Sequence, residues 1–482
     1  MDLKVLIIGE HPIAKNLIQQ YEGSGAIVEQ WNSIPVGGIS INNYGELCIL
    51  SDEGEDDKAI GMLETIGAEY DLNAHNGKKL VCHLLLKSNH ILRMLQVCDF
   101  CDIIKEKIDV YPFTMDEIWS RSIILDYIPI TLQSEEHVHL VIFGMDDISE
   151  MVAIQAAHVS HFPNYIRNHN LRTRITMVDV EAENKSRILI KKYQHLFDNS
   201  YYRVVRPSEE NAIIKYHKPL YDGKREDFVD IEWEFVEAES WDAVVREKLC
   251  LWANDPKQLL TVVMAYNDVN KNKSESLLLP QDIYNVSIPV YIYSQQIDGY
   301  DVKLPLVRMA KNINYIYDRC YDENIENWKG MLRYAVEINK EARDKSWAKL
   351  TNVKRMSSIY NAMTIPTKMR SLGLEENEWD KFYDIPQQDI EIMAQVEHNR
   401  WCVEELILGY RTCTDEEQEK IAADVKTRKD AYKTRKIHYD LRAYNDLRPD
   451  GTGKPVQVYD LCLSSCLPLI AKAFADEKGG EM

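Results

Sequence analysis

The hydrophobic pattern of the first 300 residues alternates between short apolar runs and helical repeats. The run LKVLIIG opens the chain, and apolar residues at helical spacing follow it from Ile13 to Tyr21. A second series begins with HVHLVIFG and also continues as a helix. Strands that alternate with helices are typical of parallel βαβ units. The pattern therefore predicts an α/β protein with two doubly wound parallel sheets in tandem, over 1–132 and 133–300.

The other predicted strands are ELCIL, LVCHLLL and IDVYPF in the first domain, and RITMVDVEA, VDIEWEFVEA, LLTVVMAYND and IPVYIYS in the second. Strand-like runs stop at about residue 301. The remaining pattern predicts a helical connector over 301–388 and a small, mostly α-helical domain over 389–482.

The composition narrows the class of protein. Apolar residues make up 45% of the chain and the net charge is −20, which is typical of a globular protein with an acidic surface. Such a surface repels phosphate backbones and anionic lipids, which argues against nucleic-acid binding. No run reaches the roughly 20 apolar residues that span a bilayer, and no signal-peptide pattern opens the chain. We therefore expect a cytoplasmic protein with no direct membrane insertion.

Ten cysteines at irregular spacing indicate reduced thiols instead of a disulfide framework. Cys98 and Cys101 form a single CxxC motif without a second pair. We interpret them as ordinary buried cysteines and predict no metal site.

The stretch AQVEHNRWCVEELILGY, at 394–410, has helical spacing but places polar residues where a core should be. Arg400 falls within the apolar stripe that Met393 and Val403 define, and Asn399 lies at its edge. Trp401 points to the flank. Buried Arg and Asn side chains are costly unless they are hydrogen-bonded, so this helix face must supply partners for them.

Each predicted α/β domain places a glycine at the end of its first strand, which is the context of a dinucleotide fingerprint. The first turn, GEHPIA, runs from Gly9 to Ala14 and has His11 in place of the second glycine. His11 is either a turn residue or an imidazolium that faces a phosphate. Asn32 ends the second strand, where an acid normally binds the ribose. The first set of candidate cofactor residues is Gly9, His11, Ala14 and Asn32.

The second turn, GMDDIS, begins at Gly144. Asp146 and Asp147 bring negative charge to the helix N-terminus where a phosphate would bind, and we expect them to cap that helix. Asp179 follows at the end of the next strand and is the candidate partner for a ribose. Gly144 and Asp179 complete the candidate cofactor site.

These strand–glycine–helix turns resemble the NAD-binding domain of bacterial potassium-transport regulators, the TrkA N-terminal or RCK-like family. The resemblance covers roughly 1–130 and 135–300. It implies two Rossmann-like domains that bind NAD(H) or another adenine nucleotide and regulate a transport partner. In each turn only the first glycine of the family's motif is present.

Two blocks near the C-terminus resemble the ryanodine-receptor (RyR) domain, a small helical module of calcium-release channels and many bacterial proteins. The first block supplies His398, Asn399, Arg400, Trp401, Glu405, Gly409 and Tyr410. The second is RKIHYDLRAYNDL, at 435–447. The resemblance spans about 390–465, with Tyr410 for the usual Trp and Ala443 where Pro is common.

The resemblance implies that the two blocks face one another. In one interpretation Arg400 pairs with Asp440 or Glu404 in a closed polar network. In the other, Trp401 or Tyr444 stacks on a base, and Arg400, Arg435 or Lys436 binds phosphates. The candidate ligand-binding residues are Asn399, Arg400, Trp401, Glu405, Tyr410, Arg435, Lys436, His438, Asp440 and Tyr444.

The sequence contains no HExxH, GxSxG or intact P-loop motif. The leading hypothesis is a cytoplasmic ligand-sensing regulatory protein that binds a nucleotide-like small molecule through its RyR domain, its Rossmann-like domains or both. The two resemblances point to ion transport or a bacterial defence response, with a transport or effector protein as partner and a homodimer as one arrangement. The alternatives are an NAD-dependent oxidoreductase and a ligand-free scaffold.

Overall fold

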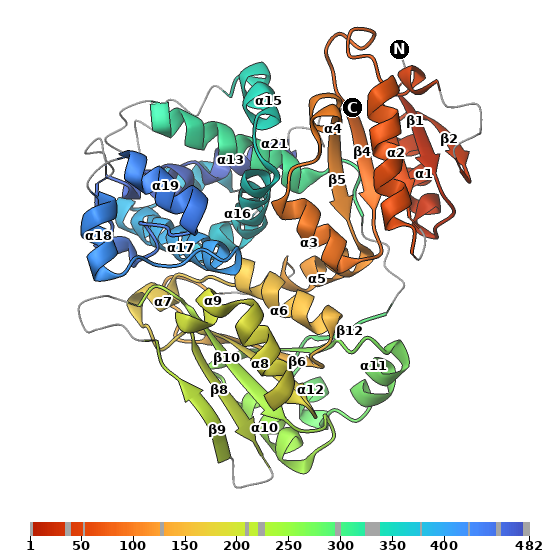
Figure 1. The fold of residues 1–482 in the computed structure, drawn as a ribbon. Coiled ribbons are helices and arrows are strands. Elements are labelled where there is room, and N and C mark those ends of the chain that lie inside the picture. Colours follow the sequence, from red (N-terminus) through yellow and green to blue (C-terminus); the bar gives the residue numbers. More distant parts are fainter. Residues whose placement is uncertain are drawn as a thin grey trace. The chain divides into compact units, whose positions relative to one another are not determined.

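The computed structural model describes residues 3–33, 40–51, 54–125, 130–207, 212–219, 227–294, 300–322, 338–375, 378–422, 425–449 and 455–475. The chain forms two compact units, each with one β-sheet (Figure 1). The first unit consists of Met1–Ser122, Gln295–Pro305 and Lys349–Met356. The second consists of Ile123–Ser294, Leu306–Ala348 and Ser357–Met482.

The sheet of the first unit has five parallel strands in the order β2-β1-β3-β4-β5. These strands are β1 (Lys4–Ile8), β2 (Ile27–Trp31), β3 (Glu46–Leu50), β4 (Leu80–Leu85) and β5 (Ile108–Phe113). Successive residues of β1 and β3 are buried on both faces of the sheet. This explains why KVLII and ELCIL are continuous apolar runs without alternation.

Helices cover both faces of this sheet. The helices are α1 (Ile13–Gly23), α2 (Asp56–Glu69), α3 (Asn89–Val97), α4 (Asp102–Lys107) and α5 (Met115–Leu125). Residues of α1 and α5 share one apolar cluster with Val5 and Ile7, whereas α2 and α3 share the other with Leu6 and Ile8. The two clusters form the core of the unit, one on each side of the sheet.

Residues 300–302 return to the first unit, where hydrogen bonds and a ring contact anchor them. The Gln20 side chain donates to the Tyr300 carbonyl (2.6 Å) and accepts from the Val302 amide (3.1 Å). The Tyr300 ring stacks on Phe113 at 3.9 Å between centroids, and its hydroxyl is hydrogen-bonded to His83. This part of the chain therefore belongs to the core of a domain that it follows by almost 200 residues.

The second sheet has seven strands in the order β12-β11-β6-β7-β10-β8-β9. The strands are β6 (His137–Phe143), β7 (Thr173–Asp179), β8 (Tyr201–Arg206), β9 (Ala212–His217), β10 (Ile231–Glu237), β11 (Gln258–Met264) and β12 (Val290–Ile292). All neighbours are parallel except β8 and β9, which are antiparallel. The sheet is therefore a parallel α/β sheet extended at one edge by a hairpin.

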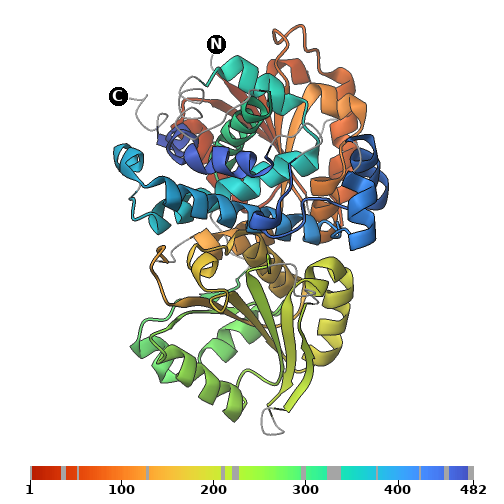
Figure 2. The ribbon, with the colours of Figure 1, turned by 90° about the vertical axis from the view of Figure 1, so that its left-hand side faces the viewer.

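The second sheet is also covered on both faces (Figure 2). Its helices are α6 (Asp147–Val159), α7 (Asn164–Arg167), α8 (Ala182–Lys192), α9 (Gln194–Asp198), α10 (Ala243–Ala253), α11 (Val269–Ser276) and α12 (Gln281–Asn285). Residues of α10 and α12 pack on Val141 and Val236 in one apolar cluster. On the other face Phe197 of α9 lies 5.0 Å from Trp233 of β10, centroid to centroid.

The C-terminal helices belong to the same compact unit as the second sheet. They are α13 (Pro305–Asp322), α15 (Lys340–Ala348), α16 (Asn352–Ser371), α17 (Gln387–Ile407), α18 (Asp415–Ala422), α19 (Val425–Arg435), α20 (Gln457–Ser465) and α21 (Leu467–Ala475), with the 3-10 turns η2 (Trp379–Asp384) and η3 (Tyr444–Asp446). Pro305 and the part of α16 up to Met356 belong to the first unit, as does the 3-10 turn η1 (Ile41–Asn43). Helix α17 packs against α6 and α20. This contact explains why almost all of α6 is buried, since the sheet and α17 cover it from opposite sides.

The predicted α/β class with parallel sheets and a helical C-terminal region is confirmed. Among the described residues no helix is both long and apolar enough to cross a membrane. The prediction that Cys98 and Cys101 are buried is wrong, because both are exposed at the end of α3 and before α4. The connection between α3 and α4, which contains both cysteines, lies at the surface.

Gly9 offers a test of backbone crowding between β1 and β3. Its φ is +116°, and a Cβ atom there would lie 2.4 Å from the Leu50 carbonyl oxygen. Gly25, with φ +82°, has open space around its Cα. We expect Gly25→Ala to lower the free energy of unfolding by about 1 kcal/mol and Gly9→Ala by about 1–3 kcal/mol more. Urea titrations measure both, and equal losses would contradict the crowding argument.

Candidate functional site

The first glycine turn joins β1 to α1, as the sequence predicts. Crowding by the neighbouring strand explains why residue 9 is a glycine. The Gly9 amide donates to Trp31 O (2.8 Å), and the approach of Leu50 leaves no space for a side chain. His11 Nδ1 accepts from the Ile13 amide (3.3 Å), which makes it a turn residue at the start of α1. Ala14 is buried in the core and Asn32 is exposed after β2.

In the second turn, the protein's own side chains crowd Gly144 and pair with Asp146. Gly144 has φ +106°, and a Cβ atom there would lie 3.0 Å from the Tyr266 ring and 3.1 Å from Ala265 O. The prediction that Asp146 caps α6 is wrong: it occupies the N-cap position, but its side chain makes no capping hydrogen bond. Its carboxylate instead pairs with Lys185 Nζ at 3.1 Å, because that ammonium is a stronger partner than an amide.

Asp179, the candidate ribose partner, is engaged in the same cluster. Its carboxylate accepts from the amides of Met145 (3.1 Å) and Glu181 (2.9 Å) and from Lys185 Nζ (2.8 Å). Both oxygens are thus used to hold the glycine turn to the end of β7. A dinucleotide in this crevice would have to displace these bonds.

Arg400 lies at the centre of a buried charge network on α17. It is 1% exposed. Its Nε donates to both Glu397 oxygens (3.0 Å each), its Nη2 to Glu397 Oε1 (2.9 Å) and its Nη1 to Glu404 Oε2 (2.8 Å). The network therefore uses Glu404, one of the two acids considered in the first interpretation, and Glu397 in place of Asp440. The i,i+3 and i,i+4 spacing brings both acids onto the arginine within one helix.

Helix α16 completes this network from the opposite side. Lys368 Nζ donates to Glu397 Oε2 (2.6 Å), Asn361 Nδ2 to Glu397 Oε1 (2.8 Å) and Ser357 Oγ to Glu404 Oε2 (3.0 Å). Burial alone would raise the pKa of Glu397, but the Arg400 and Lys368 cations outweigh it and lower the pKa to about 2. Glu397 is therefore ionised, and two buried cations share it.

A buried Cys–His–Asp chain lies next to the network. Cys402 Sγ is 3.4 Å from His398 Nε2, and His398 Nδ1 is 3.2 Å from Asp460 Oδ2. These residue types in this order can form a nucleophilic triad. Here, however, His398 Nε2 is hydrogen-bonded to the Arg442 carbonyl at 2.8 Å, and Cys402 is 0% exposed. The ring nitrogen that would serve as base is engaged by the backbone, and no substrate reaches the thiol.

Half-buried aromatic rings gather around His438, between the two predicted blocks. The centroid of the His438 ring lies 4.7 Å from Trp401, 5.2 Å from Tyr432 and 6.3 Å from Tyr410. Tyr410 and Tyr432 stack at 4.7 Å. Burial lowers the pKa of His438 to about 3, and nearby His398 adds to the effect, so the imidazole is neutral. We call Trp401, Tyr410, Tyr432 and His438 the ring cluster.

Glu405 is a buried acid beside the ring cluster. It is 6% exposed, and its Oε2 has no hydrogen-bond partner. Burial raises its pKa to about 8; the neighbouring Glu404 adds to the shift, and Arg400 and Lys436 oppose it. Glu405 also interacts electrostatically with Tyr410 and Tyr432. At neutral pH it is therefore mostly an uncharged carboxylic acid, which can both donate and accept a hydrogen bond.

The other predicted ligand-binding residues lie around the ring cluster and Glu405. Lys436 has φ +49°, donates to Leu408 O (2.9 Å) and lies over the Tyr410 ring. Arg435 pairs with Glu417 at 2.5 Å. Asn399 is buried on α17, and half-buried Asp440 has its Oδ2 3.9 Å from His438 Nδ1. Tyr444 contacts His398, 5.8 Å between centroids, and not the ring cluster.

Sequence reasoning missed four side chains that complete the site: Tyr432, Glu397, Lys368 and Asp460. Tyr432 falls in a charged segment that reads as a solvated helix, and Lys368 and Asp460 lie outside the two blocks. Glu397 precedes His398 and was available from its i,i+3 spacing to Arg400. Among the described residues, no group of three or more His, Cys, Asp or Glu side chains is arranged to hold a metal ion.

No family model matches the chain, and a search of curated proteins finds no match. The chemistry of the site is therefore argued from its own residues.

The charge network should contribute strongly to stability. We expect Arg400→Ala to lower the free energy of unfolding by about 3–5 kcal/mol, because Glu397 and Glu404 stay buried without their shared cation. Arg411→Ala is the matched control, since Arg411 also holds an acid (Glu417, 2.7 Å) but is half-exposed, and it should cost about 1 kcal/mol or less. Similar losses in urea titrations of the two variants would contradict a stabilising network.

Glu405 should make stability fall as pH rises. Its folded-state pKa of about 8 exceeds the ordinary value of 4.5, so between these values the folded chain holds a proton that the unfolded chain releases. Stability from this group is complete below about pH 4.5, falls by at most about 1.4 kcal/mol per pH unit, and levels off above about pH 8.

Glu405→Gln should remove this contribution, because glutamine mimics the protonated acid. Unfolding free energies at pH 6 and pH 8.5 measure the slope, and other titrating groups cancel in the difference between wild type and variant. An unchanged slope would show that Glu405 is ionised in the folded chain.

Proposed function

We propose that this is a cytoplasmic ligand-sensing regulatory protein whose C-terminal helical region binds an adenine nucleotide or a closely related molecule. The observation that carries the proposal is Glu405: a buried, uncharged acid without a hydrogen-bond partner at Oε2, next to half-buried aromatic rings. Buried polar atoms without partners are rare in folded proteins and call for an explanation. A ligand that hydrogen-bonds to Glu405 supplies one.

The ring cluster and Glu405 suit a nucleobase. Stacking of a base on an aromatic side chain contributes about 1–3 kcal/mol. A protonated carboxyl group offers one donor and one acceptor side by side, and adenine presents the complementary pair at N7 and N6. Trp401 and Tyr410 supply faces for stacking, and Glu405 supplies the hydrogen bonds that select the base.

Lys436 is the best candidate for a phosphate contact. Its ammonium group lies at the rim of the ring cluster, over Tyr410, and donates one hydrogen bond to Leu408 O. Two further N–H groups are available on any ammonium. Arg400 is not proposed for this role, because all of its guanidinium nitrogens donate to Glu397 and Glu404. Arg435 would first have to leave Glu417.

The resemblance of 390–465 to the RyR domain supports a binding module at this position, and the resemblance of the α/β units to TrkA-like domains supports regulation. In the second unit, strands β12-β11-β6-β7-β10 follow the strand order of a Rossmann fold. The acid expected to bind its ribose, Asp179, is engaged by Lys185 and two amides. For NAD(H) we therefore propose the turn from Gly9 to Ala14 over that of Gly144.

Signal transfer is proposed to run along α17. Glu405 follows Glu404 directly, and Glu404 joins Arg400 to Ser357 of α16. A ligand that binds Glu405 would change the electrostatic environment of Glu404, since burial and charge couple the two acids. The resulting shift in the α16–α17 contact is the change that a transport or effector protein, or a second copy of the chain, would detect.

Binding of ATP, ADP, AMP and NAD⁺, with GTP and CTP as controls, tests the proposal by isothermal titration calorimetry. We expect adenine nucleotides to bind best below pH 8 and Trp401→Ala to weaken them about 10-fold or more. Glu405→Gln should keep binding, since an amide also donates and accepts, whereas Glu405→Leu should abolish it. Equal affinity of wild type, Trp401→Ala and Glu405→Leu for every nucleotide would contradict this site.

A further inference from the structure

We propose that Cys98 and Cys101 form a redox modification site, where a reversible disulfide between them loosens the attachment of residues 349–356 to the first unit. Apart from half-buried Cys250, the other cysteines are buried, whereas this pair is exposed. Oxidation of a thiol depends on its exposure to the oxidant, so the pair is where oxidation of the chain should begin. The site uses none of the residues of the nucleotide site proposed above.

The two thiols lie at the ends of one short connection. Cys98 is the residue that follows α3, and Cys101 is the residue that precedes α4, with two residues between them. This is the CxxC spacing of redox-active dithiols. The Cys101 thiol donates to the carboxylate of Glu64 over 3.9 Å, a long and weak contact that leaves the sulfur accessible to an oxidant.

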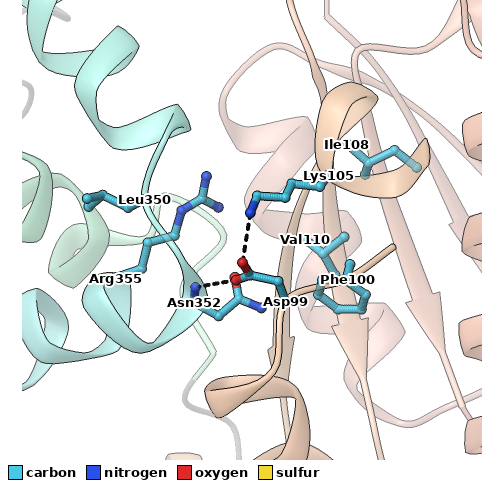
Figure 3. Close-up of a pocket in the computed structure, with 8 residues that line it drawn as sticks. All are labelled: Asp99, Phe100, Lys105, Ile108, Val110, Leu350, Asn352 and Arg355. Atoms are coloured by element: carbon cyan, nitrogen blue, oxygen red, sulfur yellow. Dashed lines mark hydrogen bonds and ion pairs between the residues drawn. The ribbon is translucent and has the colours of Figure 1, made fainter. Parts of the chain in front are cut away.

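This connection also holds the start of α16. The Asn352 side-chain amide donates to Leu95 O (2.9 Å) and to Cys98 O (3.0 Å). The Asn352 backbone amide donates to the Asp99 carboxylate (2.7 Å), and so does Lys105 Nζ (2.7 Å). Figure 3 shows Asp99 between these two donors. Two of the acceptors of Asn352, the Cys98 carbonyl and the Asp99 carboxylate, therefore belong to the CxxC segment itself.

Asp99 binds both donors as a carboxylate. Burial would raise its pKa, but the hydrogen bonds from Lys105 and from the Asn352 amide outweigh burial and lower the pKa. Hydrogen bonds to an ionised group are stronger than those between neutral groups. The position of the Asp99 backbone therefore contributes to how firmly the start of α16 is held.

A disulfide changes the shape of this connection. The backbone of Cys98 is extended, and residues 99–101 form no turn. The Cα atoms of a disulfide lie within about 7 Å of each other, so a bond across two intervening residues requires a tight turn. Forming this turn rotates the Cys98 carbonyl and moves Asp99 away from Asn352. The bond to Leu95 O within α3 remains, so the attachment of residues 349–356 weakens but is not lost.

The oxidant is a low-molecular-weight disulfide, such as glutathione disulfide. The thiolate of one cysteine attacks a glutathione sulfur, forms a mixed disulfide and releases one glutathione. The thiolate of the other cysteine then attacks the protein sulfur of the mixed disulfide, closes the Cys98–Cys101 bond and releases the second glutathione. Each cysteine loses one electron and one proton, and glutathione disulfide takes up both to become two thiols. Exposed disulfides are readily reduced, so an excess of thiol reverses the reaction.

Mass spectrometry of the full chain after treatment with glutathione disulfide tests the chemistry. Trypsin releases both cysteines in one peptide, 94–105, and we expect this peptide to contain an internal disulfide that dithiothreitol reduces. Cys98→Ser and Cys101→Ser should each prevent it. Cys250→Ser is the matched control, because it removes the half-buried thiol of the second unit, and it should leave the disulfide unchanged.

Hydrogen exchange of peptides that cover 350–356 tests the loosening. Oxidation should speed their exchange about 10-fold in wild type and in Cys250→Ser, because two hydrogen bonds of Asn352 are lost. It should have no effect in Cys98→Ser. Asn352→Ala should exchange fast in the reduced state and show no further response to oxidation.

Three results would overturn the proposal. The first is that glutathione disulfide leaves both thiols of the 94–105 peptide reduced or gives mixed disulfides alone. The second is equal exchange of 350–356 in oxidised and reduced wild type. The third is an Asn352→Ala variant whose exchange responds to oxidation as much as that of wild type, since the effect would then not pass through Asn352.

Discussion

The buried guanidinium of Arg400 is the interaction on which the C-terminal region depends. Ionised Glu397 and the second acid Glu404 enclose it within α17, and three side chains of α16 complete the coordination of these acids. A charge in a low-dielectric interior is tolerated only when such partners are in place. The two helices are therefore held in one register by hydrogen bonds that no apolar contact would specify. Glu405 is buried by the same packing and lacks a partner at Oε2; burial, with the neighbouring Glu404, raises its pKa so that it keeps its proton.

Arg400 and Glu405 lie on adjacent turns of α17, and their hydrogen bonding differs. Arg400 has every nitrogen satisfied, so it has nothing left to offer a ligand anion. Glu405 has an unsatisfied oxygen and faces the rings of Tyr410 and Tyr432, so it has both the capacity and the setting for recognition.

The two glycine turns show how one sequence signal can have a purely structural cause. Gly9 and Gly144 both end the first strand of a parallel sheet, and both meet the backbone of the strand that lies beside it, at Leu50 and Ala265. At Gly9 the backbone of Leu50 leaves no space for a side chain, and at Gly144 Tyr266 and the backbone of Ala265 crowd one. The first glycine of a dinucleotide motif therefore carries information about the fold even where the rest of the motif is absent.

The sequence by itself determined the α/β class, the alternation of strands and helices, and the anomaly of a charged residue on the apolar face of α17, because periodicity reports which residues must be buried. For Arg400 it left two alternatives open, an acid (Asp440 or Glu404) or a ligand anion, and the structure shows Glu404 as one partner. Only the tertiary structure decided that Glu397 is the second acid and that Lys368 shares it. It also brought Tyr432 to His438, and residues 300–302 and 349–356 into the first unit. These outcomes depend on contacts between segments far apart in the chain, and a local pattern carries no information about which distant segment supplies the partner.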